Sequence, residues 1–77
     1  MEIEILTPDR DIFKGEIVSA TFPGKDGSFG VMNNHAPMIA ALKVGEIVVK
    51  SENGEQAFKV KGGVVEILKN KVIVLAE

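Results

Sequence analysis

The side chains of this sequence that could perform catalysis gather in one stretch. His35 is the only histidine, and Ser28 and Asp26 precede it closely. A serine nucleophile needs a histidine base, an acid that orients this base, and a sharp strand-to-helix turn that presents the serine. The sequence around Ser28 shows no such context. We therefore expect His35, which follows two asparagines, to hydrogen-bond a turn or to lie at a contact surface.

The sequence offers no ligand set typical of a metal centre. It has one histidine and no cysteine, and acidic residues such as Glu16 and Glu66 are scattered singly along predicted strands. A zinc site needs several converging nitrogen or sulfur ligands, and a calcium loop needs oxygen ligands at fixed spacing. We expect no metal, no cofactor and no thiol chemistry.

A glycine-rich segment extends from Gly24 to Gly30, with glycine at every third position. Such a segment could cradle a phosphate, but it lacks the Gly-Lys-Ser/Thr ending and no helical pattern follows it. Glycine adopts positive φ at little cost, so we expect a shaped loop. Phe29 lies within it, and this ring is expected either to serve a protein contact or to anchor in the core.

Length and charge restrict the function further. The chain has 77 residues, of which 45% are apolar, and it is expected to form a single domain over residues 1–77. Nine basic residues against eleven acidic ones give no positive field for phosphate backbones, so we expect no nucleic-acid ligand. The absence of cysteine favours a cytosolic protein. No apolar run approaches the ~20 residues that span a bilayer, so no direct membrane insertion is expected.

The elements that position these side chains are predicted to be strands. Ten valines and eight isoleucines against four leucines favour pleated structure over helix. Alternation predicts a strand at Glu2 to Ile5, and a second at Glu16 to Phe22 after a turn at Lys14-Gly15. Between Ala36 and Lys43 the choice stays open, because Pro37 could begin a short helix.

The carboxy-terminal half predicts two hairpins. The segments Glu46 to Lys50 and Ala57 to Lys61 flank Asn53-Gly54, a strong hairpin-turn pair. A second hairpin joins Val64 to Leu68 with Val72 to Leu75. Both sets of alternate residues in the last strand are apolar, so we expect it to lie inside a stack of two sheets. Short strands with frequent turns predict an all-β fold, a flattened β-sandwich or barrel.

Several blocks of the sequence, taken in order, resemble the amino-terminal β-domain of the epsilon subunit of F-type ATP synthases. The blocks are Phe13–Ile17, Pro23–Val31, His35–Met38, Lys43–Gly45, Gly62–Ile67 and Val72–Ala76. The most specific part is the Pro-Gly-x-x-Gly-x-x-Gly segment that leads to His-Ala-Pro. Asn33-Asn34 stand where the family usually has Pro-Gly. Many members also carry a carboxy-terminal helical hairpin, which has no counterpart in these residues.

The resemblance implies a fold and a function. The fold is a sandwich of two mostly antiparallel five-stranded sheets, about ten short strands in all, with Met38 to Leu42 as a strand. The function is that of a central-stalk (rotor) subunit with no chemistry of its own. It couples ion-driven rotation of the c ring to the gamma subunit and so to ATP synthesis. The implied location is the cytoplasmic face of the bacterial inner membrane, where the complex holds the protein peripherally.

Matching positions imply two contact sites. The c-ring contact comprises Lys25, Asp26, Gly27, Ser28 and Phe29, and the gamma contact comprises Asn34, His35 and Met38. We expect the charged residues of the first site to tune association, and an apolar hot spot near Phe29 or Met38.

One alternative stays open on the residues alone. A free-standing small β-sandwich could act as a binding module that recognises a peptide or a glycan through an open sheet edge. Such a module would need exposed aromatic side chains on one face, and the sequence has only four phenylalanines and no other aromatic residue.

Overall fold

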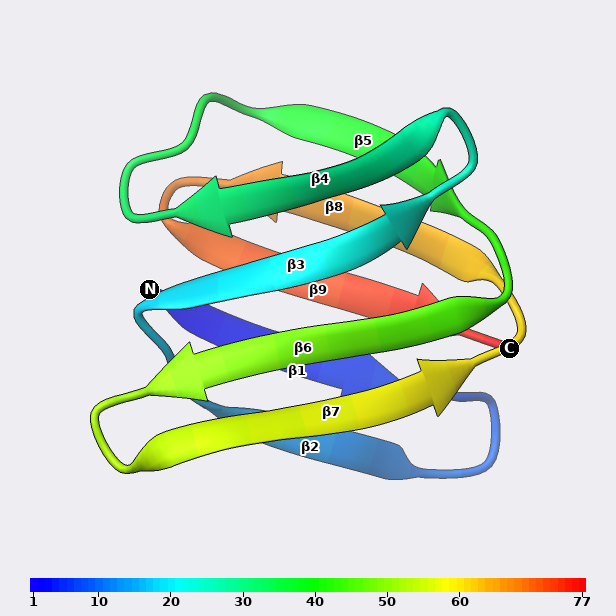
Figure 1. The fold of residues 1–77 in the computed structure, drawn as a ribbon, viewed down its shortest axis with the longest axis horizontal. Helices are drawn as coiled ribbons and strands as arrows, with labels where there is room; N and C mark the ends of the chain where they lie inside the picture. The colour runs from blue at the N-terminus through cyan, green and yellow to red at the C-terminus, as the bar shows by residue number, and fades with distance from the viewer.

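The computed structural model describes all 77 residues, Met1 to Glu77, and contains nine strands and no helix (Figure 1). The strands are β1 (Glu2–Leu6), β2 (Asp11–Glu16), β3 (Ser19–Gly24), β4 (Gly27–Met32), β5 (Met38–Leu42), β6 (Gly45–Ser51), β7 (Gly54–Val60), β8 (Gly63–Leu68) and β9 (Lys71–Ala76). No segment is therefore a helix long and apolar enough to cross a membrane. The predicted all-β class is confirmed, with nine strands instead of about ten.

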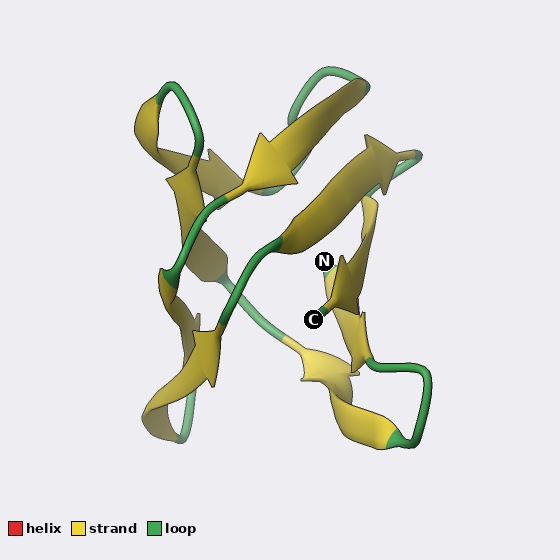
Figure 2. Cartoon of the chain, turned by 90° about the vertical axis from the view of Figure 1, so that its right-hand side faces the viewer, coloured by secondary structure: helices red, strands yellow, loops and turns green.

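All nine strands belong to one curled sheet in the order β2-β1-β9-β8-β5-β3-β6-β7, with β4 paired to β3. β3 and β5 meet through a single residue pair, Gly24 with Leu42, so the sheet folds there into two layers. β2, β1, β9, β8 and β5 form one layer, and β4, β3, β6 and β7 form the other (Figures 1 and 2). Only the pairing of β1 with β9 is parallel. The mostly antiparallel sandwich is thus confirmed, with layers of five and four strands.

The space between the layers holds an entirely apolar core. Alternate residues of each strand point inward, as the period of two requires. In the five-stranded layer the inward side chains include Ile3 and Ile5 of β1, and in the other layer they include Phe22 of β3 and Ile47 of β6. No polar or charged side chain is buried. The core therefore holds no ionisable side chain that would need a partner.

Two aromatic pairs complete the packing. Phe13 of β2 lies against Phe58 of β7, with ring centroids 5.2 Å apart. β2 and β7 are the two ends of the strand order, one in each layer, and no backbone pairing joins them. This ring contact therefore closes the sandwich along its open side. The other pair, Phe22 and Phe29, stacks at 5.4 Å between neighbouring strands β3 and β4.

The amino-terminal half corrects one prediction. Lys14-Gly15 does not form a turn but lies inside β2, where Lys14 pairs with Glu4 of β1. The chain leaves this strand after Glu16, and the next strand begins only at Ser19. The side chains of Ile12 and Phe13 pack against the core and draw this segment into the sheet. Their burial outweighs the preference of glycine for a turn.

The glycine-rich segment also differs from the prediction. Only Lys25 and Asp26 form the turn, because Gly24 pairs with Gly27 and the rest of the segment belongs to β4. The inward packing of Phe29 and Val31 explains the extension of the strand. A tight hairpin replaces the expected loop from Gly24 to Gly30.

The later elements follow the sequence more closely. Both carboxy-terminal hairpins are present, β6 with β7 and β8 with β9. The turn of the first hairpin lies at Glu52-Asn53, one residue before the predicted pair Asn53-Gly54. The open choice at Ala36 to Lys43 resolves to strand β5. The expectation that β9 is buried on both faces is wrong, because Leu75 is 58% exposed. Nothing in this chain covers the outer face of that layer.

Candidate functional site

The turn at Lys25-Asp26 is the most exposed part of the predicted ring contact. Both side chains face solvent, as do Gly27 and Ser28. The turn is nevertheless held in place, because the backbone N–H of Lys25 donates to the carbonyl oxygen of Ala41 at 3.0 Å. A charged tip on a fixed backbone is suited to a polar contact at the rim of an interface.

Phe29 has a different environment from the tip. Its ring is half-buried and stacks on Phe22, which is fully buried. A Cβ atom at Gly24 would lie 2.9 Å from the Phe29 ring and 2.5 Å from the Gly27 carbonyl oxygen, so glycine is needed there. Phe29 thus anchors the hairpin to the core and exposes only part of its ring. A cleft of about 480 Å³ opens beside it, towards Met38 and the rest of β5.

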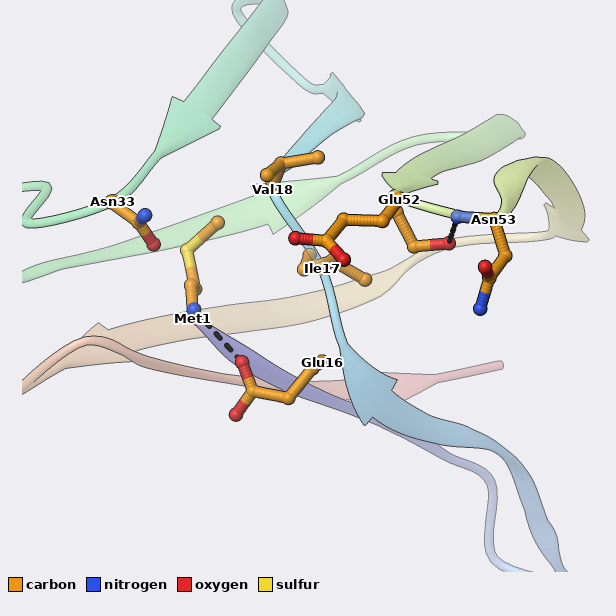
Figure 3. A pocket seen from close by; sticks show the side chains of 8 residues that line it. Met1, Glu16, Ile17, Val18, Asn33, Glu52 and Asn53 are labelled. Carbon is orange, nitrogen blue, oxygen red and sulfur yellow. Dashed lines mark hydrogen bonds and ion pairs between the residues drawn. The ribbon is translucent and has the colours of Figure 1, made fainter.

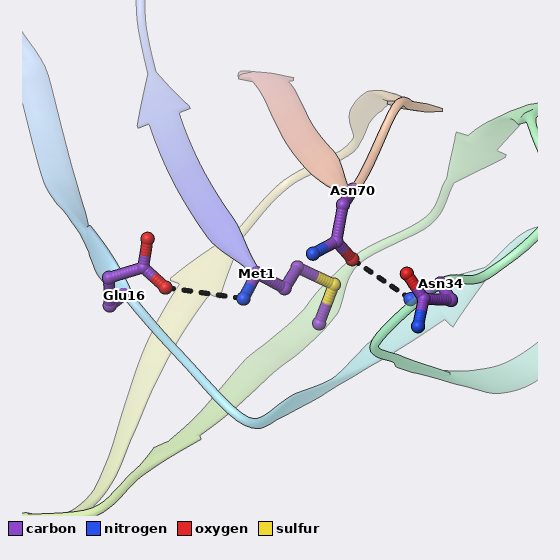
Figure 4. A network of polar contacts seen from close by, with 4 residues as sticks. All are labelled: Met1, Glu16, Asn34 and Asn70. Atoms are coloured by element: carbon purple, nitrogen blue, oxygen red, sulfur yellow. Dashed lines mark hydrogen bonds and ion pairs between the residues drawn. The ribbon is translucent and has the colours of Figure 1, made fainter.

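The predicted gamma contact lies on the loop between β4 and β5. The backbone N–H of Asn34 donates to the side-chain oxygen of Asn70 at 2.9 Å, which ties this loop to the turn between β8 and β9 (Figure 4). The backbone N–H of His35 donates to the carbonyl of Met32 at 3.2 Å. Nδ1 of His35 lies 2.7 Å from the carbonyl oxygen of Ala36 and donates to it. The ring therefore supports the turn, as the sequence suggested.

The structure does not bring the possible catalytic residues together. Asp26 lies in the turn that precedes β4, whereas His35 lies in the loop that follows β4, and these two connections lie at opposite ends of the strand (Figure 1). Six residues of extended chain span roughly 20 Å. Met38, at the start of β5, lies near the end that carries His35. The Lys25-Asp26 turn and the Asn34-His35 loop are therefore separated by the length of β4, whereas Met38 lines the same cleft as the predicted ring-contact residues.

A polar recess surrounds the amino group of Met1 (Figure 3). This nitrogen lies 3.2 Å from Oε2 of Glu16, and the side chain of Met1 is buried. Asn33 and Glu52 line the recess from other connections. The structure contains no group of three or more acidic or histidine side chains placed to hold a metal ion. The recess therefore offers no metal-ligand set.

A network of charges, most of them partly exposed, covers the outer surface of β1, β2 and β9. Nζ of Lys71 lies 3.3 Å from Oε1 of Glu4 and 3.7 Å from Oε1 of Glu2. Lys14 lies 3.7 Å from the same oxygen of Glu4. The hydrogen bond to Glu4, followed by the charges of Glu4 and Glu2, raises the pKa of Lys71 above its ordinary value of 10.5. Because these groups face solvent, the network contributes little to stability.

Two features escaped the sequence reasoning. Asn70 lies in the connection of the predicted second hairpin and also fixes the loop that carries Asn34; no local pattern indicates this contact across 36 residues. The outer aliphatic residues of β8 and β9 were the second omission. The alternation of β9, which is apolar on both faces, is the signal for them, but it equally predicts a covering sheet.

None of the four phenylalanines is exposed. Phe22 is fully buried, and Phe13, Phe29 and Phe58 are half-buried. A glycan-binding module depends on aromatic faces open to solvent. The structure gives this alternative no such face.

Comparison with known proteins assigns the chain to a family. A family model described as "ATP synthase, Delta/Epsilon chain, beta-sandwich domain" matches residues 1–77. The chain belongs to this family. The ATP synthase epsilon chain of Chlorobium limicola is 42% identical over 77 residues, which cover 99% of this chain and 88% of that protein. The epsilon chain of Dichelobacter nodosus is 38% identical over 77 residues, which cover 99% of this chain and 54% of that protein.

Solved structures show the same fold. A chain in the cryo-EM structure of the Euglena gracilis mitochondrial ATP synthase, which contains OSCP, F1 and the c-ring, superposes with a TM-score of 0.89 at 22% identity. The match covers 96% of this epsilon-type chain and 48% of the Euglena chain. A chain from the central stalk and c-ring of the Tetrahymena thermophila mitochondrial ATP synthase superposes with a TM-score of 0.82 at 20% identity. This match covers 99% of the present chain and 62% of the Tetrahymena chain. Chains of these two assemblies thus share the β-sandwich fold of this protein.

Proposed function

We propose that this chain is a rotor subunit of an ATP synthase, which joins the ring of c subunits to the gamma subunit of the central stalk. The observation that carries the proposal is the match of the epsilon-chain β-sandwich family to residues 1–77. Rotation of the ring, driven by ion flow, passes through this domain to gamma and so to ATP synthesis. The domain performs no bond chemistry.

The geometry supports a role in transmitting force. Continuous backbone pairing links the strands, and the Phe13–Phe58 contact closes the side where that pairing stops. A sandwich closed in this way resists shear between its layers, because its interior is packed as densely as a crystal. A coupler between two turning parts needs this resistance.

The two predicted contacts suit different partners. We assign the turn at Lys25-Asp26, with Gly27, Ser28 and the exposed part of Phe29, to the polar loops of the c ring. The loop of Asn34 and His35, with Met38 beside it, is assigned to gamma. The Lys25-Asp26 turn and the Asn34-His35 loop lie at opposite ends of β4, which allows both partners to bind at once. This arrangement holds the domain at the cytoplasmic face of the bacterial inner membrane, peripheral through the complex.

Binding to purified gamma and to purified c ring from the same organism tests the proposal. We expect a saturable one-to-one complex with gamma. The variant Asp26→Arg should weaken ring binding and spare gamma binding, whereas His35→Ala should do the reverse. Glu55→Gln, on the exposed surface of β7, is the matched control and should change neither. A folded chain that binds neither partner would overturn the proposal.

A further inference from the structure

The outer surface of the five-stranded layer carries an apolar patch. We call it the β8 face and define it by Ile39 of β5, Val64 and Leu68 of β8, and Ile73 and Leu75 of β9. Ile39 is 71% exposed, Leu75 58%, Leu68 49% and Val64 43%. Four of the seven large exposed apolar side chains of the molecule thus lie on this one face. An exposed apolar patch of this kind marks an interaction surface.

Over β6 and β7 the opposite outer surface is mostly charged. The outward positions of β6 include Glu46 and Lys50, and those of β7 include Glu55 and Lys59, all of them exposed. Lys50 and Glu55 form an ion pair at 3.7 Å across these strands. The two layers therefore differ in character, and only the β8 face lacks a cover suited to it.

One carboxylate stands at the centre of the β8 face. Glu66 pairs in register with Ile39 on one side and with Ile73 on the other. Val64 and Leu68 lie two positions away along the strand, so they share its face. Glu66 is exposed and takes part in none of the five ion pairs of the structure. A shallow hollow of about 390 Å³ lies beside it, lined by Ile39, Leu68 and Pro37 among others.

The central charge decides what can cover the patch. A purely apolar partner would strip water from Glu66 without replacing its hydrogen bonds, which is costly for a carboxylate. A second copy of this chain, related by a two-fold axis through the patch, would place two Glu66 carboxylates near each other, and like charges in an interface are also costly. The surface therefore requires a different partner, which carries a cation among apolar residues.

The dimensions of the patch fit one helix. β5, β8 and β9 are successive neighbours, so the patch spans two strand spacings, about 10 Å, which is the width of one α-helix. Outward residues on β8 recur about every 6.6 Å, close to the helical pitch of about 5.4 Å. β8 and β9 are each paired with a neighbouring strand on both sides, so an added strand finds no free backbone groups over them.

We infer that the β8 face docks an amphipathic helix that carries one lysine or arginine in its apolar stripe, and that this cation pairs with Glu66. Aliphatic residues one turn before and after the cation fill the positions beside Val64 and Leu68. The inference rests on the proposed function, because it assigns this helix to the gamma subunit. The loop of Asn34 and His35 leads directly into β5, so the β8 face and the proposed gamma contact are neighbours.

Substitution of Glu66 by leucine tests the charge requirement directly. In Glu66→Leu the partner's cation is left without its carboxylate, so the affinity for gamma should fall about tenfold or more. Glu66→Gln keeps the size of the side chain and should weaken binding less. Glu46→Leu, on the opposite face, makes the same chemical change and should leave the affinity within about twofold. Circular dichroism verifies that each variant is folded.

The outcomes separate the two claims. If wild-type chain binds gamma and Glu66→Leu binds equally or more tightly, the charge pairing is overturned and the proposed function stands. If folded wild-type chain fails to bind gamma, both fall. Sedimentation equilibrium of the isolated chain should show a monomer, and a dimer that Glu66→Arg disrupts would assign the patch to a second copy and overturn the inference.

Discussion

Closure of the sandwich by Phe13 and Phe58 gives a prediction that can be worked out from the geometry. The ring centroids are 5.2 Å apart and the ring planes are inclined by 41°, within the range of favourable aromatic pairs. Such a pair contributes about 0.5–1.5 kcal/mol beyond its buried area. Phe13→Leu and Phe58→Leu each preserve most of the volume, so each should lower the free energy of unfolding by about 1 kcal/mol.

A double-mutant cycle measures the contact itself. Urea denaturation of the wild type, both single variants and the double variant should show a combined loss about 1 kcal/mol smaller than the sum of the single losses. Phe13→Leu combined with Phe29→Leu is the control, because Phe29 belongs to the other aromatic pair; its effects should add within about 0.5 kcal/mol. If the Phe13 and Phe58 effects add equally well, this contact does not couple the two layers.

Two further predictions concern single positions. Gly63 has φ +138°, and a Cβ atom there would clash with the carbonyl oxygen of Leu75. Gly63→Ala should therefore lower the free energy of unfolding, measured by urea denaturation, by about 3 kcal/mol. Gly30→Ala is the control, because the nearest atom to a Cβ there is 3.8 Å away, and an equally small loss in Gly63→Ala would contradict the packing. Lys71 has a pKa raised above 10.5, mainly by Glu4, so its stabilising effect is complete below pH 10.5 and is lost as the pH rises through the folded-state pKa. Stability should therefore fall more steeply above this pH in the wild type than in Lys71→Met, and parallel curves would refute the linkage.

The strands that the sequence identified best are those whose pattern and turn chemistry agree. The segments around Asn53-Gly54 and around Lys69-Asn70 combine alternation with residues that tolerate positive φ, and Lys69 and Asn70 do adopt φ values of 51° and 60°. At both positions the local preference for a turn agrees with the pairing of the flanking strands. Lys14-Gly15 shows the opposite case, since the burial of neighbouring apolar side chains overrides the local preference for a turn.

The contact sites could be located only in part. The exposed tip at Lys25-Asp26 and the turn around His35 follow from local polarity and glycine spacing. The contact between Asn34 and Asn70 joins two turns distant in sequence, so no periodic pattern reveals it. The β8 face was hidden for another reason: an apolar position predicts burial, but the sequence does not say whether the same chain or a partner provides it.

The most direct test of the rotor role uses a covalent link within the assembled ATP synthase. The chain contains no cysteine, so Ser28→Cys provides a single reactive site at the predicted ring contact. Oxidation with a cysteine placed in the polar loop of the c subunit should join the two, and ATP hydrolysis with ion pumping should continue because both parts turn together. A link that forms in high yield and stops turnover would show that the chain does not move with the ring.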